Sequence, residues 1–232
     1  MKNVLKCSVL IFLIQSIFLF NSCKKDEAAP PITTPTDADG NTYNTVTIGT
    51  QVWLKENLRT TKYLNGDLIG TTTPATLNLN GENTPKYQWA YEANESNAVT
   101  YGRLYTWYAA TDSRKVCPAG WHVPSNAEWT VLTTYLGGEA IAGGKLKEDG
   151  TAHWLTPNTG ATNETGFKAV PSGSRSGFGT FEGIGLYTDI WSSTEKNPLY
   201  AIVRGIGSTS SEITGFAPFN KYDGLAVRCL KD

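Results

Sequence analysis

Few residues in this chain have side chains that could carry chemistry: four cysteines, two histidines and 21 acidic residues among 232. His122 follows Trp121 in a Trp-His-Val-Pro segment, where an imidazole more often holds structure than acts as a base. His153 stands beside Trp154 in a polar loop and has no serine or cysteine nucleophile motif near it. We therefore expect neither histidine to be catalytic.

Paired carboxylates are the remaining route to catalysis, because two of them flanking a sugar can hydrolyse a glycosidic bond. The candidates are Glu148, Asp149, Glu164, Glu182, Asp189 and Glu195. No spacing among them singles out two residues, so the sequence names no catalytic residue. We expect a protein that is not an enzyme, with a glycoside hydrolase-like activity as the alternative.

The four cysteines are separated by their positions. Cys7 directly precedes an apolar N-terminal run and Cys23 follows it, which leaves Cys117 and Cys229 as the pair in the folded region. In an oxidising compartment such a pair is expected to form a disulfide, and two buried free thiols are the alternative. Two cysteines and two histidines without close spacing predict no metal site.

The N-terminus has the pattern of an export signal. Two lysines precede an apolar run at 8–20, which is shorter than the about 20 apolar residues that span a bilayer. Ser22 before Cys23 resembles a bacterial lipoprotein cleavage site. We predict that residues 1–22 are a signal peptide and that acylated Cys23 anchors the protein to a membrane. The alternative is an ordinary secretory signal with an incidental cysteine.

The segment after the cysteine bears on location. Lys24-Lys25-Asp26-Glu27 resembles the surface-export signal of Bacteroidota lipoproteins, and a soluble, charged start of a linker explains it equally well. Residues 23–36 are rich in Ala, Pro and Thr, a composition typical of a semi-extended tether. We expect an exported outer-membrane lipoprotein that is exposed on the cell surface.

Composition indicates one globular domain at 37–232. Removing residues 1–22 takes away two lysines and leaves 18 basic and 21 acidic residues, a formal charge of −3. No basic patch favours nucleic acid, and we expect no such partner. Seven Trp, eleven Tyr and 23 Gly indicate a rigid, turn-rich domain, whose length suffices for one sizeable core.

Local patterns predict the elements of this domain. Alternation across Gly49-Thr50 predicts a hairpin at 46–54, with Trp53 facing opposite to Val52 and Leu54. Ser125 and Glu128 form a capping box for a helix that ends at Gly137. Further expectations are a turn at 37–41 rather than a calcium loop, a buried helix at 101–110, and strands near 87–91, 167–170, 190–193, 201–204 and 225–230. Two or three helices with many short strands predict an α+β domain.

Several motifs in fixed order resemble one known family. They include Tyr-Gly-Arg-Leu-Tyr-Thr-Trp-Tyr at 101–108 and Cys-Pro-Ala-Gly-Trp-His-Val-Pro at 117–124, with further matches at 37–43, 48–58, 125–129, 144–147, 163–167, 191–195 and 227–229. Together these resemble the Fibrobacter succinogenes major paralogous domain, over about residues 37–232. The chain departs from it at 169–175, where Val170 and Ser174 replace the usual Leu and Tyr. The resemblance implies a compact, loop-rich fold similar to C-type-lectin-like and formylglycine-generating-enzyme-like domains.

This resemblance favours a non-catalytic binding module that presents loops on a stiff scaffold. Aromatic faces with polar neighbours suit sugars, so a glycan or polysaccharide is the expected ligand. The candidate ligand-binding residues are Trp154, Arg175, Tyr187, Asp189 and Tyr222, whereas Trp53, Trp107, Trp121, Trp129 and Trp191 belong to motifs and are expected in the core. Calcium enters by fold analogy only, and no cofactor is expected. The alternative is an adhesion or envelope-structural protein with a surface protein as its partner.

Overall fold

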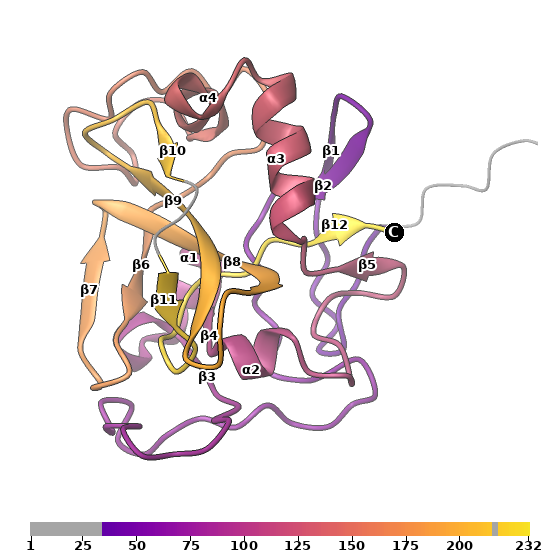
Figure 1. The fold of residues 1–232 in the computed structure, drawn as a ribbon, viewed down its shortest axis with the longest axis vertical. Helices are drawn as coiled ribbons and strands as arrows, with labels where there is room; N and C mark the ends of the chain where they lie inside the picture. Colours follow the sequence, from indigo (N-terminus) through magenta and orange to yellow (C-terminus); the bar gives the residue numbers. More distant parts are fainter. Residues whose placement is uncertain (1–33, 215–217) are drawn as a thin grey trace, which may run out of the picture. The chain divides into compact units, whose positions relative to one another are not determined.

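The structure is a computed structural model that describes residues 34–214 and 218–232 (Figure 1). Thr34 to Asp232 form one compact unit. The predicted signal peptide, Cys23 and most of the predicted tether lie outside the described residues. Within the described ranges, no helix combines the length and the apolar character needed to cross a membrane.

The N-terminal hairpin separates two hydrophobic cores. β1 (Thr45–Ile48) and β2 (Gln51–Leu54) pair antiparallel across a two-residue turn, as predicted. Because side chains alternate across a strand, Trp53 enters one core while Leu54 enters the other, with Val52 packed against it. The hairpin therefore forms a wall between the two cores.

Three small sheets complete the strand framework (Figure 1). The first has the order β1-β2-β12-β5, with β12 (Leu230–Lys231) and β5 (Trp121–His122). The second has the order β10-β9-β8-β6-β7, with β11 also paired to β9; its strands are β6 (Ser172–Arg175), β7 (Phe181–Ile184), β8 (Tyr187–Glu195), β9 (Tyr200–Gly207), β10 (Ile213–Thr214) and β11 (Pro218–Asn220). The third pairs β3 (Gln88–Trp89) with β4 (Leu104–Tyr105).

Four α-helices and one short 3₁₀ segment occur in the described residues, where two or three helices were predicted. They are η1 (Tyr91–Ala93), α1 (Glu95–Tyr101), α2 (Trp107–Ala110), α3 (Asn126–Tyr135) and α4 (Glu139–Leu146). The capping box before α3 is confirmed: the Ser125 hydroxyl accepts from the Glu128 N–H, and the Glu128 carboxylate accepts from the Ser125 N–H. Gly137 follows the helix with a φ of 96°, as its predicted stop requires. The α+β class is therefore confirmed.

Two predicted elements are corrected. The helix expected at 101–110 is only α2, because the Tyr105 N–H donates to the Leu225 carbonyl and Leu104–Tyr105 pair with β3. The strand expected at 167–170 reduces to a single bridge between Lys147 and Ala169. In both places, pairing with a segment distant in sequence decides the local backbone.

The turn predicted at 37–41 is present, and the Asp37 side chain accepts hydrogen bonds from backbone N–H groups of the same turn. Asp37 Oδ1 accepts from the N–H groups of Asp39 and Asn41, and Oδ2 accepts from the Tyr43 hydroxyl at 2.6 Å. The turn therefore uses the Asp37 carboxylate for its own hydrogen bonds. No cluster of three or more potential metal ligands occurs within the described ranges.

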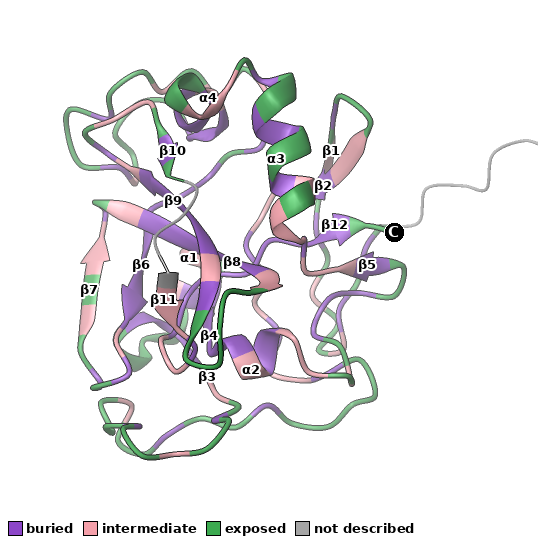
Figure 2. Cartoon of the chain, viewed as in Figure 1, coloured by how far each residue is buried: buried purple, intermediate pink, exposed green. Residues whose placement is uncertain are grey.

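The buried residues, which are purple in Figure 2, include two hydrophobic cores. In one core, the Trp53 ring lies 4.7 Å from the Trp129 ring, and Phe167 packs edge-on against both. The other core contains Cys117 joined to Cys229 by the predicted disulfide. This bond ties the segment before β5 to the one before β12.

We expect the double variant Cys117→Ser, Cys229→Ser to unfold more easily. The bond closes a loop with a sequence separation of 112 residues, and closing a loop of about 100 residues is worth about 4.7 kcal/mol in the chain-entropy model. Urea unfolding measures the loss. Reducing agent should destabilise the parent equally and leave the double variant unchanged; a parent insensitive to reduction contradicts this role.

Candidate functional site

Trp154, predicted as a ligand-binding residue, lies in the core. Its side chain is 1% exposed, and its indole N–H donates to the Ala169 carbonyl at 2.9 Å. The polar residues around it suggested a surface position, but the bridge between Lys147 and Ala169 closes the loop over the ring. The structure therefore offers no face of Trp154 to a ligand.

Arg175, the second predicted residue, is fully buried beneath the surface loops. Its guanidinium stacks 4.0 Å from the Trp89 ring centroid and donates to the carbonyls of Ala75, Ser176 and Leu77. Burial lowers its pKa to about 10, which leaves the group charged at neutral pH. Arg175 therefore positions the surrounding loops.

Tyr187 and Asp189 occupy neighbouring same-face positions on β8. The Tyr187 hydroxyl shares a hydrogen bond of 3.0 Å with the Ser174 hydroxyl. Asp189 is buried, and desolvation, with the charges of Asp223 and Glu182, raises its pKa to about 7. A Cβ on the opposite residue, Gly205, would lie 2.7 Å from Asp189 Oδ1, so any larger residue there would displace the Asp189 carboxyl.

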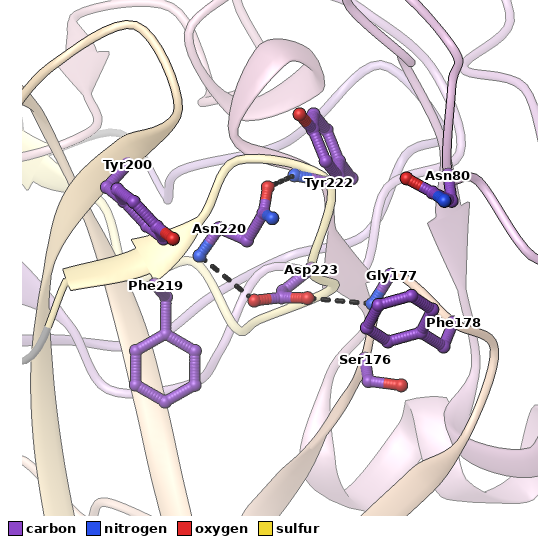
Figure 3. A pocket seen from close by; sticks show the side chains of 9 residues that line it. All are labelled: Asn80, Ser176, Gly177, Phe178, Tyr200, Phe219, Asn220, Tyr222 and Asp223. Atoms are coloured by element: carbon purple, nitrogen blue, oxygen red, sulfur yellow. Dashed lines mark hydrogen bonds between the residues drawn. The ribbon is translucent and has the colours of Figure 1, made fainter.

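Tyr222 is the predicted residue that lines a pocket, and the pocket is built mainly of aromatic and amide side chains (Figure 3). Its volume is about 350 Å³. The lining residues are Asn80, Ser176, Gly177, Phe178, Tyr200, Phe219, Asn220, Tyr222 and Asp223. They come from the loop after β6, the start of β9, the end of β11 with the turn that follows, and the 79–80 segment. We call this the aromatic pocket.

Asp223 holds the walls of the aromatic pocket together. Its Oδ1 accepts from the Gly177 N–H at 2.7 Å, and its Oδ2 accepts from the Asn220 N–H at 3.0 Å (Figure 3). The Gly177 carbonyl in turn accepts from the Leu79 N–H, which fixes the segment that carries Asn80. One carboxylate thus sets the relative positions of three chain segments.

The aromatic pocket is negatively charged. Among the nine described residues that line it, Asp223 alone has a carboxylate, and none is Lys, Arg or His. Burial raises the pKa of Asp223 to about 6, although its two backbone hydrogen bonds and Arg175 act in the opposite direction. Asp223 is therefore mostly ionised at neutral pH.

The two histidines pair with carboxylates elsewhere. His122 lies between Asp232 at 2.7 Å and Glu128 at 3.0 Å, so it links the C-terminal residue to the start of α3. His153 Nδ1 lies 2.6 Å from Glu148 Oε2. Neither histidine lines the aromatic pocket.

The sequence patterns did not indicate most of the residues that line the pocket, including Phe178 and Asp223. One signal was available: Phe178 stands between two glycines in Ser176-Gly177-Phe178-Gly179, and a large apolar side chain at such a turn tip is expected in solvent. Its side chain is 71% exposed. No sequence pattern indicated Asn80, because the hydrogen bond that places its segment at the site, from Leu79 to Gly177, spans nearly a hundred residues of sequence.

The fold and the pocket define a small, disulfide-linked α+β domain with a loop-built surface site. The chain belongs to a family: residues 46–231 match the Fibrobacter succinogenes major domain. This confirms the family that the ordered motifs indicated. No curated protein and no solved structure matches the chain.

Asp189 generates a prediction about pH and stability. Its folded-state pKa, about 7, lies above the value of an unfolded chain, so the native state holds the proton more tightly. The contribution of Asp189 to stability therefore falls as pH rises from about 4 to about 7 and is constant above that range. Asp189→Asn should remove this fall and stabilise the fold by up to about 4 kcal/mol at pH 7.5 relative to the parent, since that is the free energy that corresponds to a pKa raised from 3.8 to about 7.

Urea unfolding at acidic and neutral pH tests this prediction. Asp149→Asn is the matched control, because Asp149 is an exposed aspartate. If Asp189→Asn keeps the pH dependence of the parent, the buried carboxyl is not its source.

Proposed function

We propose that this protein is an exported, surface-exposed lipoprotein that acts as a non-catalytic binding module for a glycan. The observation that carries the proposal is the grouping of four aromatic rings, two amides and one carboxylate around a single pocket. The pocket lies on loops, and two of its walls share Asp223 as a hydrogen-bond acceptor. Such a site is preorganised for binding.

The chemistry of the pocket suits a sugar. Aromatic rings stack on the apolar face of a pyranose, while amide and carboxylate groups pair with its hydroxyls. The volume of about 350 Å³ lies at the lower end of the range for small-ligand sites. Phe178 and Tyr200 are exposed, so their rings are open to a ligand from solvent. A terminal sugar unit of a longer chain fits this arrangement.

Two features support export. The disulfide between Cys117 and Cys229 is typical of domains that fold outside the cytoplasm. The basic start, the apolar run and Cys23 follow the pattern of a lipoprotein signal. A C-type-lectin-like fold, which the family resemblance implies, is part of the same proposal, because such folds carry binding loops on a rigid scaffold.

A glycan and polysaccharide array, probed with and without calcium, tests the binding function. The probe is the oxidised mature chain carrying Cys23→Ala, so that it stays in solution. A specific hit is expected. A negative result on folded protein contradicts glycan binding and favours the alternative function, binding of a protein in the envelope. A pull-down from envelope extracts would identify that protein.

Substitutions locate the site. Phe178→Ala and Tyr222→Ala should each weaken glycan binding about tenfold, since losing one stacking face costs about 1.4 kcal/mol. Val99→Ala is the control, because Val99 is an exposed apolar residue on α1 that does not line the pocket. Calorimetry measures the affinities, and parent-like binding by both variants would place the site elsewhere.

The anchor has its own test. Cys23→Ala should move the protein from the membrane fraction to the soluble fraction of cells, because the acyl chains supply the membrane affinity. Fractionation and mass analysis of the N-terminal peptide measure the change. Continued membrane association of an acylated Cys23→Ala chain contradicts the proposed anchor.

A further inference from the structure

We propose that the aromatic pocket selects an ammonium group, either a protonated amine or a quaternary ammonium, on its ligand. The proposal deepens the binding function above and rests on it for the identity of the carrier: a saccharide with a free amine, that is, an amino sugar. An amino sugar and an ammonium compound without a sugar both carry a cationic nitrogen, and the experiment below distinguishes between these two ligands.

The geometry supports a cation through the rings. Phe178, Tyr200, Phe219 and Tyr222 line the same pocket as Asp223 (Figure 3), and the Phe219 side chain also packs against one of the hydrophobic cores. An ammonium group is attracted to the negative face of an aromatic ring, and several rings around one point form the usual site for such a group. A neutral sugar needs only a stacking face, whereas this pocket combines aromatic side chains with a carboxylate.

The charge of Asp223 is not neutralised by a cation in the pocket. The guanidinium of Arg175 is stacked on Trp89 and donates to three backbone carbonyls, and its charge acts on Asp223 without a hydrogen bond between the two side chains. Lys221, a sequence neighbour, directs its ammonium to Glu195 at 3.1 Å and to the Pro198 carbonyl. Neither basic residue lines the pocket.

The groups that act on Asp223 from the surrounding strands are mostly acidic. Arg175 from β6 lowers its pKa, Glu182 from β7 raises it, and Asp189 on β8 interacts with both carboxylates. Asp189 is about half protonated at neutral pH, so the negative charge of the pocket comes mainly from Asp223. Because no basic residue lines the pocket, this charge favours a cationic ligand over a neutral or anionic one.

This arrangement links binding to pH. A bound cation favours the ionised form of Asp223, so binding lowers its pKa below about 6 and releases a proton in acidic solution. Affinity for a quaternary ammonium, which does not titrate, should therefore rise from pH 5 to about pH 7 and level off above it. The opposite slope, or none, contradicts an ionised carboxylate at the site.

The test compares two oligosaccharides that differ in one group. Calorimetry with the Cys23→Ala mature chain measures binding of a glucosamine oligomer, which has free amines, and of the N-acetylglucosamine oligomer of equal length, which is neutral. Choline serves as the ammonium without a sugar. We expect the glucosamine oligomer to bind at least about tenfold more tightly than its acetylated partner.

Substitutions separate cation recognition from apolar contact. Phe178→Leu keeps an apolar side chain but removes the ring, so it should reduce the preference for the amine, and Phe178→Trp should retain or increase it. Because Phe178 is 71% exposed, these variants are expected to fold. Asp223→Asn should abolish the preference, but it also alters two loop hydrogen bonds, so Phe178→Leu is the deciding variant.

Each outcome decides one claim. Equal affinity for the two oligosaccharides overturns the ammonium preference and leaves glycan binding in place. Binding of choline, with no glycan of any charge bound, supports the ammonium site and overturns the glycan function. Failure of both choline and the glucosamine oligomer to bind overturns the ammonium preference, and the neutral glycans then decide the function alone.

Discussion

The buried guanidinium of Arg228 is the interaction on which the rest of this structure depends. It donates to four acceptors: the carbonyls of Leu54, Lys55 and Phe167, and the side-chain oxygen of Asn57. Burial lowers its pKa to about 9, so it remains charged, and carbonyl and amide dipoles must compensate for that charge. The N-terminal hairpin, the Phe167 loop and the C-terminal segment are therefore held in one arrangement. Cys229, the next residue, adds the covalent link to Cys117.

The same C-terminal segment also fixes the position of the aromatic pocket through its backbone hydrogen bonds. Gly224 exchanges two backbone hydrogen bonds with Arg175, at 2.9 and 2.7 Å, directly after the pocket residue Asp223. Ala226 donates to the carbonyl of Asp189, and its carbonyl accepts from Trp191 on β8. The turn that forms one wall of the pocket is thus continuous with the segment that carries Arg228 and Cys229. A site supported in this way loses little conformational entropy when a ligand binds.

The sequence predicted the elements that local physics determines and missed those that depend on distant contacts. The capping box at Ser125 and the hairpin around Gly49-Thr50 follow from short-range patterns, and both are confirmed. The single cysteine pair in the folded region identified the disulfide by elimination. Trp154 could not be placed in this way, because its burial depends on the bridge between Lys147 and Ala169. For the same reason, of the predicted ligand-binding residues Tyr222 alone lines the pocket, while its other walls come from segments that meet only in the fold.

An NMR titration would show whether the aromatic pocket is the binding site. The isotope-labelled mature chain would be titrated with a glucosamine oligomer while its backbone amide signals are followed. The N–H groups of Gly177 and Asn220 donate to Asp223, so a cation that engages this carboxylate must change both signals. We expect these two amides to show the largest changes, together with their neighbours in the loops after β6 and β11. Saturable changes confined to another part of the domain, with Gly177 and Asn220 unmoved, would contradict this expectation.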